Sequence, residues 1–214
     1  MIFHLDLDTF FVSVERILDN SLEGKPVIVG ADPQGRGVVS ACSYEARSFG
    51  VRSGMPIKQA YKLCPKGIYL HGHGKEYIRY SELVGNLLEK YAPIIEKASI
   101  DECYMDFSGC EKVYGNLFLF AQKIQRKIFQ ELLLPCSIGI GGNKTIAKIC
   151  SDFCKPMGVA YVPKGVEKEF LASLPVEVIP GVGKVMLKEL NSRGIILVSD
   201  LTKLPSDFLS MTYG

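Results

Sequence analysis

The pattern of hydrophobic and polar positions changes its period along the chain, and each change predicts a new element. Apolar or alternating runs predict strands at residues 1–8, 25–30, 38–42, 94–100, 103–107, 135–141 and 159–162. Helical spacing predicts helices at residues 10–18, 44–49, 56–63, 75–91, 113–134 and 143–153. From residue 75 onward, with the first strand added, this order predicts a ferredoxin-like α+β layer.

Turn and cap residues place the ends of several elements. A loop at residues 32–37, rich in Asp, Pro and Gly, joins two of the short strands into a predicted β-hairpin. Thr9 and Asn143 stand at the N-cap positions of the helices that follow them. Glu15 and Arg16 are expected on the outer face of the first helix.

The chain changes character at Pro163. From there, short helical segments are interrupted by prolines and glycines, which predicts a small all-α module. The last residues, 211–214, carry no helix-ending signal. We therefore expect the sequence to be truncated at this end.

Composition excludes several classes of protein. Hydrophobic residues make up 47% and charged residues 22% of the 214 residues, as in ordinary soluble globular proteins. No apolar run reaches the roughly 20 residues of a membrane span, and Asp6 and Asp8 interrupt the N-terminal run. We expect no membrane contact and no secretory signal. The seven scattered cysteines indicate reduced thiols in a cytoplasmic protein.

The net charge of +2 is unevenly distributed. Residues 1–110 hold 12 Lys and Arg against 14 Asp and Glu, whereas residues 111–214 hold 13 against 9. We expect contacts with phosphate groups mainly in the basic second half.

Two acidic clusters nearly a hundred residues apart suggest a metal site. Asp6 and Asp8 lie in the first apolar run, and Asp101 and Glu102 lie between two others. Burying carboxylates is costly without a compensating cation, and hard divalent ions such as Mg²⁺ prefer oxygen ligands. Asp101 and Glu102 can converge at a turn or bulge, and Asp6 ends its strand beside the carbonyl of Leu7.

Such a site would suit two ions about 3.5–4 Å apart, as in phosphoryl transfer. The alternative is that the acids cap turns and face solvent. We assign Asp8 and Asp106 to that alternative.

Six sequence motifs in order carry a family resemblance. They are DLDTFFVSVE at 6–15, SACSYEARSFGV at 40–51, SIDECYMD at 99–106, SIGI at 137–140 followed by Asn143-Lys144, KPMG at 155–158, and IPGVGK at 179–184. Together they resemble Y-family translesion DNA polymerases, in particular the polymerase IV branch, over essentially the whole sequence.

The resemblance implies a domain organisation and an activity. The domains would be a palm (residues 1–10 and 74–163), a fingers insertion (11–73) and a small helix-hairpin-helix thumb (164–214), which we expect to be truncated. The little-finger domain of the family would lie outside this sequence. The activity would be error-prone, template-dependent DNA synthesis, in which a primer 3′-hydroxyl attacks a deoxynucleoside triphosphate (dNTP) during translesion synthesis.

The resemblance also implies a role for each matching residue. Asp6, Asp101 and Glu102 would be catalytic and, with the carbonyl of Leu7, would bind two Mg²⁺ ions. The dNTP would contact the following five residues: Phe10, Phe11, Tyr44, Arg47 and Lys155.

Within this set, Phe11 matches the steric gate that rejects ribonucleotides, and the side chain of Phe10 is expected in the core. Tyr44, Arg47 and Lys155 match triphosphate ligands; exposed helix charge is the alternative for Arg47 and Lys155. Ala41 replaces a threonine often found in the family, so a hydroxyl contact to the triphosphate is missing.

The thumb and the partners follow from the same resemblance. Gly181, Gly183 and Lys184 would contact DNA phosphates through a helix-hairpin-helix, with an ordinary helix–helix turn as the alternative. The implied partners of a monomeric enzyme are primer-template DNA, a dNTP and a sliding clamp bound through the absent C-terminal region.

Two further motifs are discounted. Residues 139–145 resemble a phosphate-binding P-loop, but Asn143 stands where the second glycine must be. Neither Cys150 with Cys154 nor His71 with His73 supplies four zinc ligands.

Two other functions are less consistent with the sequence. A diguanylate-cyclase-like enzyme would need Gly-Gly before the acidic pair, where this chain has Ser99-Ile100. A catalytically silent DNA-binding scaffold would be expected to lack one of the three acids.

Overall fold

The largest unit is built on a five-stranded sheet whose central strand carries the first acidic cluster. The computed structural model describes residues 1–213. The strand order is β5-β6-β1-β7-β8, and the strands are β1 (Ile2–Leu7), β5 (Ile94–Lys97), β6 (Glu102–Asp106), β7 (Cys136–Gly141) and β8 (Val159–Tyr161). Strand β1 is antiparallel to both β6 and β7, and β8 runs parallel to β7. The first four strands in this order have the predicted ferredoxin-like topology.

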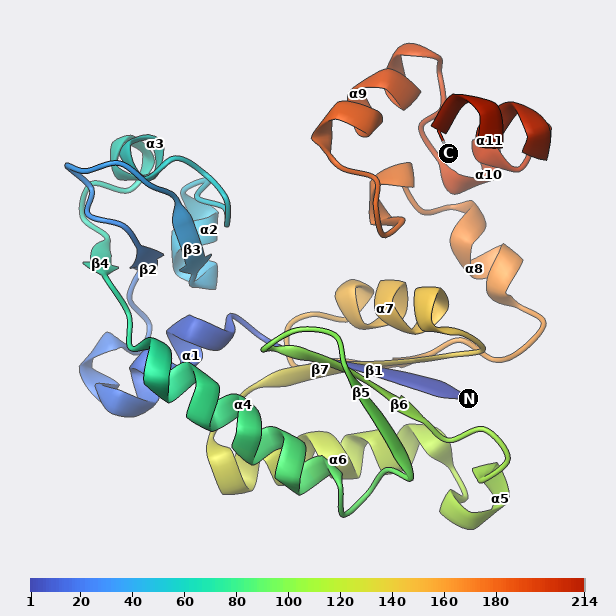
Figure 1. The fold of residues 1–214 in the computed structure, drawn as a ribbon, viewed down its shortest axis with the longest axis horizontal. Helices are drawn as coiled ribbons and strands as arrows, with labels where there is room; N and C mark the ends of the chain where they lie inside the picture. Colours follow the sequence, from blue (N-terminus) through green and yellow to red (C-terminus); the bar gives the residue numbers. More distant parts are fainter. Residues whose placement is uncertain (214) are drawn as a thin grey trace.

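Helices cover both faces of this sheet, and the sheet together with these helices is called the large unit. Figure 1 shows α4 (Gly74–Leu88) and α6 (Leu117–Leu132) against one face and α7 (Lys144–Phe153) against the other. Helix α7 approaches β7 closely because Gly139 has no side chain there. A Cβ atom at Gly139 would overlap the backbone of Ala147 and Ser151. Apolar residues fill the core between the sheet and α4 and α6, among them Phe3, Leu5, Met105, Phe107, Ile124 and Ile138.

A second unit, the small-sheet unit, has its own core. Its sheet has the order β3-β2-β4, from β2 (Val27–Gly30), β3 (Val39–Cys42) and β4 (Ile68–Leu70), and it packs with α2 (Tyr44–Ser48) and α3 (Ile57–Leu63). The predicted hairpin is confirmed, since β2 and β3 pair antiparallel. Strand β4 was not predicted. The helix α1 (Phe10–Leu18) and the short 3-10 helix η1 (Asn20–Leu22) connect the two units.

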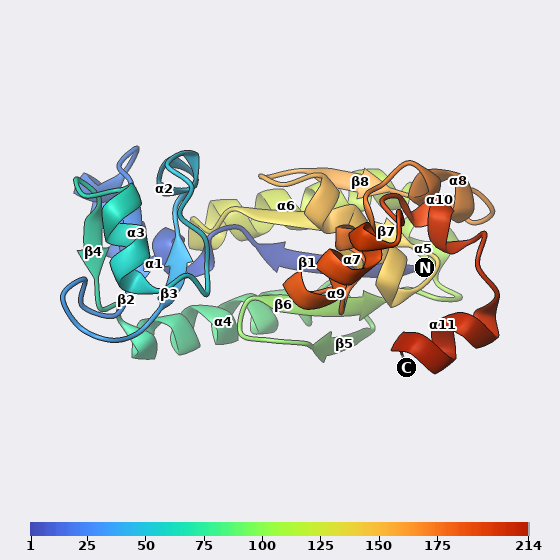
Figure 2. The same ribbon diagram turned by 90° about the horizontal axis from the view of Figure 1, so that it is seen from above.

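The remaining helices form a C-terminal module, as the sequence predicted. It contains α8 (Glu167–Ala172), the 3-10 helix η2 (Val176–Val178), α9 (Lys184–Ser192), α10 (Val198–Leu201) and α11 (Ser206–Tyr213). Its buried core is small: Val176, Leu190 and Ile195. Figures 1 and 2 show the module and the small-sheet unit at opposite ends of the large unit, on its α7 side.

The structure corrects several predicted boundaries. The strand predicted at 94–100 ends at Lys97, and Glu102 opens β6, so the turn occupies residues 98–101. The helix predicted at 113–134 is two helices, α5 (Glu111–Tyr114) and α6, because Gly115 between them has a positive φ of 64°. In the described part of the chain, no helix has the length and apolar character to cross a membrane.

Two predictions for single residues near the first helix are wrong. Glu15 is buried, with 3% of its surface exposed, instead of lying on the outer face. Thr9 occupies the N-cap position of α1 but adopts a left-handed conformation, and its side chain accepts no capping hydrogen bond. Asn143, in contrast, caps α7 as predicted, because its side chain accepts a 2.9 Å hydrogen bond from the amide of Ile146.

Candidate active site

The two acidic clusters meet where β1 ends and β6 begins. Asp6 and Glu102 are direct partners in the antiparallel register, and such partners project to the same face of a sheet. The amide of Leu7 donates a 2.9 Å hydrogen bond to the carbonyl of Asp101, so the turn carrying Asp101 lies against the end of β1. Strand pairing therefore brings together three acids that are distant in sequence.

Each of the two strand acids has a lysine as its counter-ion. Lys155 Nζ lies 2.6 Å from Asp6 Oδ2 and 2.8 Å from Asp152 Oδ1. Lys148 Nζ, on α7, lies 2.6 Å from Glu102 Oε2. The Asp101 carboxylate instead accepts a 2.6 Å hydrogen bond from the hydroxyl of Ser99, within its own turn.

The environments of Asp6 and Glu102 shift their pKa values in opposite directions. Burial raises the pKa of Asp6 to about 7; the Lys155 ammonium opposes this rise, and the charge of Glu102 adds to it. The nearby ring of His4 and the hydrogen bond from Lys148 lower the pKa of Glu102 to about 2 against the opposing effect of burial. His4 Nε2 lies 3.5 Å from Glu102 Oε2. Two paired acids thus differ in how readily they ionise.

A pocket of about 320 Å³ brings the carboxylates together with residues of the small-sheet unit. Its lining includes every residue predicted for metal and dNTP binding: Asp6, Leu7, Phe10, Phe11, Tyr44, Arg47, Asp101, Glu102 and Lys155. Ser40 and Ala41 line the same pocket. A hollow lined by acids together with Arg47 and Lys155 can hold a phosphorylated ligand together with a cation.

The two adjacent phenylalanines have different environments, as predicted. Phe10 is 2% exposed and belongs to the core. Phe11 is half-buried, and its ring stacks on that of Tyr77 with 4.1 Å between centroids and 6° between planes. The hydroxyl of Tyr77 donates a 2.5 Å hydrogen bond to the buried carboxylate of Glu15. Phe11 is therefore positioned by Tyr77, which is itself hydrogen-bonded to a buried residue.

Asp8 does not face solvent, contrary to its assignment from the sequence. It is 1% exposed, accepts hydrogen bonds from the hydroxyl of Ser137 at 3.0 Å and from the amide of Met157 at 2.8 Å, and burial raises its pKa. Asp8 therefore fastens the loop after α7, which carries Lys155, to the end of β1. Asp106 accepts a hydrogen bond from the amide of Ser108 at 2.8 Å, as predicted for a turn cap.

Sequence reasoning missed four residues around this pocket: His4, Glu15, Tyr77 and Lys148. One signal was available for His4, because it lies two positions before Asp6 in a strand and therefore shares its face. Tyr77 lies 62 positions from its partner Glu15, and Lys148 lies 46 positions from its partner Glu102. No local sequence pattern predicts contacts between residues so far apart.

Comparisons with known proteins agree with this geometry. Residues 5–152 match the impB/mucB/samB family. The chain belongs to this family. Among curated relatives, a DNA polymerase IV of Dehalococcoides mccartyi is 43% identical over 213 residues, covering 100% of this chain and 55% of the relative. A DNA polymerase IV of Listeria monocytogenes is 45% identical over 202 residues, covering 94% of this chain and 57% of the relative.

Solved structures extend the similarity to the fold. DinB from Sulfolobus solfataricus superposes with a TM-score of 0.90 at 34% identity, covering 98% of this chain and 62% of that protein. An insertion ternary complex of Dbh DNA polymerase gives a TM-score of 0.88 at 34% identity, covering 99% and 63%. The resemblance to Y-family polymerases is confirmed. The chain spans a little over half the length of its curated relatives.

The donor set of this family member fits hard divalent ions. Asp6, Asp101 and Glu102 offer only carboxylate oxygens, which Mg²⁺ prefers, and the pKa of Glu102 keeps that ligand ionised at neutral pH. Within residues 1–213, however, no three His, Cys, Asp or Glu side chains are already gathered as a metal site. Lysines pair with two of the acids, and Ser99 holds the third.

The three predicted thumb residues lie away from this pocket, in the C-terminal module. Gly183 precedes α9 at its N-cap position, Lys184 is the first residue of α9, and Gly181 has a positive φ of 99°. All three are exposed. The amides of Val182 and Gly183 donate to carbonyls within this turn, so the backbone donors it offers to a ligand are those of the first turn of α9.

Proposed function

We propose that this chain is the catalytic part of an error-prone, template-dependent DNA polymerase that adds dNTPs to a primer 3′-hydroxyl in translesion synthesis. The observation that supports it most is the pairing of Asp6 with Glu102, beside Asp101, in a pocket shared with Phe11, Tyr44 and Arg47. The activity of the relatives named above agrees with this proposal.

In this proposal, Asp6, Asp101, Glu102 and the carbonyl of Leu7 hold two Mg²⁺ ions. When bound, these ions supply the charge neutralisation that attack on a triphosphate requires. The protein's own contribution is to position the reactants, because the three acids come from the rigid end of one sheet.

The remaining pocket residues bind the nucleotide. Arg47 and Lys155 pair with phosphate oxygens, the hydroxyl of Tyr44 donates to them, and the amides of Phe10 and Phe11 add donors at the first turn of α1. The ring of Phe11 lies under the sugar and leaves no room for a 2′-hydroxyl. The small side chains of Ser40 and Ala41 leave the base pair loosely enclosed, which agrees with low fidelity.

The domain boundaries remain those expected from the sequence. We assign residues 1–10 and 74–163 to the palm, 11–73 to the fingers and 164–214 to the thumb, and we propose that Gly181, Gly183 and Lys184 contact DNA phosphates. The small-sheet unit and the C-terminal module each contain a buried cluster of their own, which supports this division, although Val27 and Val29 of β2 pack into the core of the large unit.

The remaining proposals concern partners and location. We propose that primer-template DNA is bound by a monomer and that a sliding clamp binds a region outside this sequence. A cytoplasmic location is supported by the cysteines, which form no disulfide in the described residues, five of them buried.

Primer extension with Mg²⁺, a defined template and all four dNTPs tests the function. Asp101→Ala and Glu102→Ala are each expected to lower the extension rate by orders of magnitude without changing the circular dichroism spectrum. Glu96→Ala is the matched control, since Glu96 lies on the neighbouring strand β5 and pairs with Lys144. Unchanged extension by either active-site variant would exclude the proposed metal site.

A further inference from the structure

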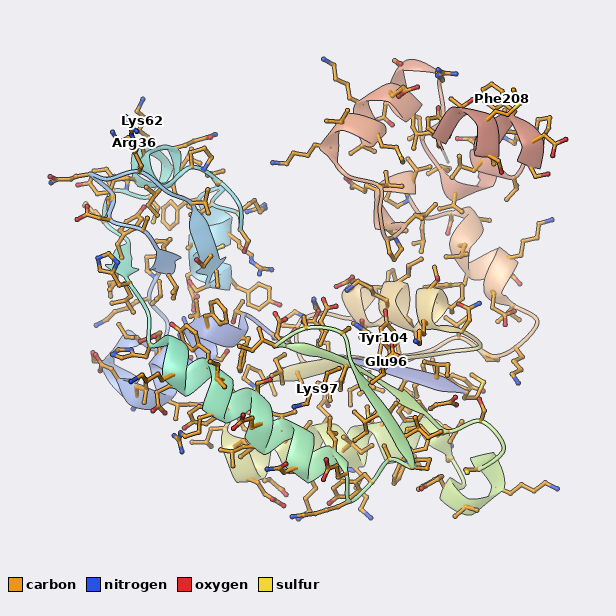
Figure 3. All side chains as sticks on the ribbon, in the orientation of Figure 1. Arg36, Lys62, Glu96, Lys97, Tyr104 and Phe208 are labelled. Carbon is orange, nitrogen blue, oxygen red and sulfur yellow. The ribbon has the colours of Figure 1, made fainter. Side chains whose placement is uncertain are left out.

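Helix α7 presents two lysines, one turn apart, to two acids of the sheet. Lys148 Nζ lies 2.6 Å from Glu102 Oε2, and both side chains are about a quarter exposed (24% and 25%). Lys144 Nζ lies 2.5 Å from Glu96 Oε2, with about half of each side chain exposed (51% and 58%). Figure 3 labels Glu96 beside its cross-strand neighbour Tyr104, over whose ring Lys144 also lies. The pairs match in chemistry and differ in position, because only Glu102 lines the pocket.

Lys148 pairs with Glu102, and the proposed metal site needs the same carboxylate as a ligand. Asp6 and Glu102 are cross-strand partners, so their carboxylates repel each other unless a cation lies between or beside them. Lys148 and Lys155 provide these cations in the described structure. This explains why acids that share one pocket are not gathered as a ligand set.

Lys148 and Lys155 differ in the interactions that each would lose when a divalent ion binds. Lys155 also pairs with Asp152, at 2.8 Å, and under the proposed function it would gain phosphate oxygens when a nucleotide binds. The hydrogen bond of Lys148 is made to Glu102, which a divalent ion would need. Competition for an acid oxygen is therefore sharpest at Lys148.

We propose that Lys148 competes with a divalent ion for the carboxylate of Glu102. This inference rests on the proposed function, because it takes Glu102 to be a metal ligand. Lys148 balances the charge of Glu102 when no ion is bound, and it lowers the affinity of the site for an ion until it releases Glu102. Lys148 is thus a positioning residue that sets metal affinity.

Binding of Mn²⁺, measured from the electron paramagnetic resonance signal of the free ion, tests the competition without any turnover. Lys148→Met removes the charge and the donor, and we expect it to bind Mn²⁺ about tenfold more tightly, because a charge-assisted hydrogen bond no longer has to be broken. Lys144→Met, the matched control, is expected to bind like the unaltered chain. Equal affinity of Lys148→Met and the unaltered chain, including no measurable binding by either, would overturn the inference.

Two further measurements test the inference even if Lys148→Met folds poorly. Lys148→Arg keeps the charge and can grip Glu102 with two hydrogen bonds, so its affinity for Mn²⁺ should equal or fall below that of the unaltered chain. Tighter binding by Lys148→Arg would contradict the competition. In thermal unfolding, Lys148→Met should have a lower midpoint without metal and a larger rise in midpoint on adding Mn²⁺.

Substitution of the ligand itself separates this inference from the proposed function. If Glu102→Gln binds Mn²⁺ as well as the unaltered chain does, the proposed metal site fails and the competition fails with it. If Glu102→Gln loses binding but Lys148→Met binds like the unaltered chain, only the role of Lys148 fails.

Discussion

Phe11 is positioned by a chain of contacts that begins at a buried charge. The carboxylate of Glu15 accepts hydrogen bonds from Tyr77 and from the backbone and ring of His73, and the ring of Tyr77 stacks on Phe11. Phe11 and Glu15 are four positions apart on α1, as are His73 and Tyr77 at the start of α4. Two helices are thus joined on the side where the proposed gate lies.

Removal of the proposed gate should change sugar selection. Phe11→Ala opens the space under the sugar, so we expect the preference for dNTPs over ribonucleotides to fall by at least tenfold, measured as the ratio of kcat/KM values. Phe10→Leu is the control, since the side chain of Phe10 lies in the core and its loss should affect stability instead. Continued rejection of ribonucleotides by Phe11→Ala would place the gate elsewhere.

Asp6 should make the stability of the metal-free protein depend on pH. Its pKa is about 7 in the folded chain against an ordinary 3.8, so folding takes up a proton between these values. The contribution of Asp6 to the free energy of unfolding therefore decreases as the pH rises from about 4 to about 7. In urea unfolding without divalent ions, Asp6→Asn should remove this decrease; an identical pH profile for both proteins would show that Asp6 ionises normally.

At the scale of elements, α7 connects the sheet to both lysine counter-ions. Its start is fixed by the Asn143 cap, its packing by Gly139 on β7, and its end leads to Lys155. A shift of α7 away from the sheet would therefore separate Lys148 and Lys155 from their acids.

The close approach at Gly139 gives a direct test of this arrangement. Gly139→Ala places a methyl group where the backbone of Ala147 and Ser151 lies, and neither can move without displacing α7. We expect a loss of about 1–3 kcal/mol in the free energy of unfolding, measured with urea. Gly142→Ala is the control, because its new methyl group meets the flexible end of Glu167, and its cost should stay within about 0.5 kcal/mol. Equal effects of the two substitutions would exclude close packing as the cause.

The elements show which parts of the fold and site a sequence can predict. The acids Asp6, Asp101 and Glu102 were predicted because they interrupt apolar runs, and strand pairing places such interruptions together. Glu15 was placed wrongly because a polar residue in a helical pattern is expected outside. Its partners Tyr77 and His73 belong to a helix that begins about sixty residues later, and the local pattern contains no information about them.

At the scale of the whole molecule, the pocket is shared between the large unit and the small-sheet unit. Asp6 and Glu102 belong to the large unit, whereas Tyr44 and Arg47 belong to α2 of the small-sheet unit. Figure 3 labels Arg36 and Lys62 at the outer tip of that unit, on the end away from the large unit. A movement between the units would change the nucleotide contacts while leaving the carboxylate pair intact.

The C-terminal module should unfold independently of the rest. Its buried core consists of few residues, and Leu190 is 2% exposed within it, so Leu190→Ala should cost about 2–5 kcal/mol locally. In hydrogen exchange followed by mass spectrometry, we expect faster exchange in α9 to α11 and unchanged protection in β1, β6 and β7. Faster exchange throughout the large unit would show that the units unfold together.

Thr9, finally, has a φ of 45° and a ψ of 42°, a conformation that β-branched residues rarely adopt. It stands between Asp6 and Phe11, where the strand that bears the acid gives way to the helix that bears the gate. A residue keeps a strained backbone conformation only where the surrounding structure fixes it, so this turn has little freedom to bend. The spacing between Asp6 and the ring of Phe11 would then be set by this one turn of the backbone, so that a change at Thr9 would alter sugar selection and metal binding together.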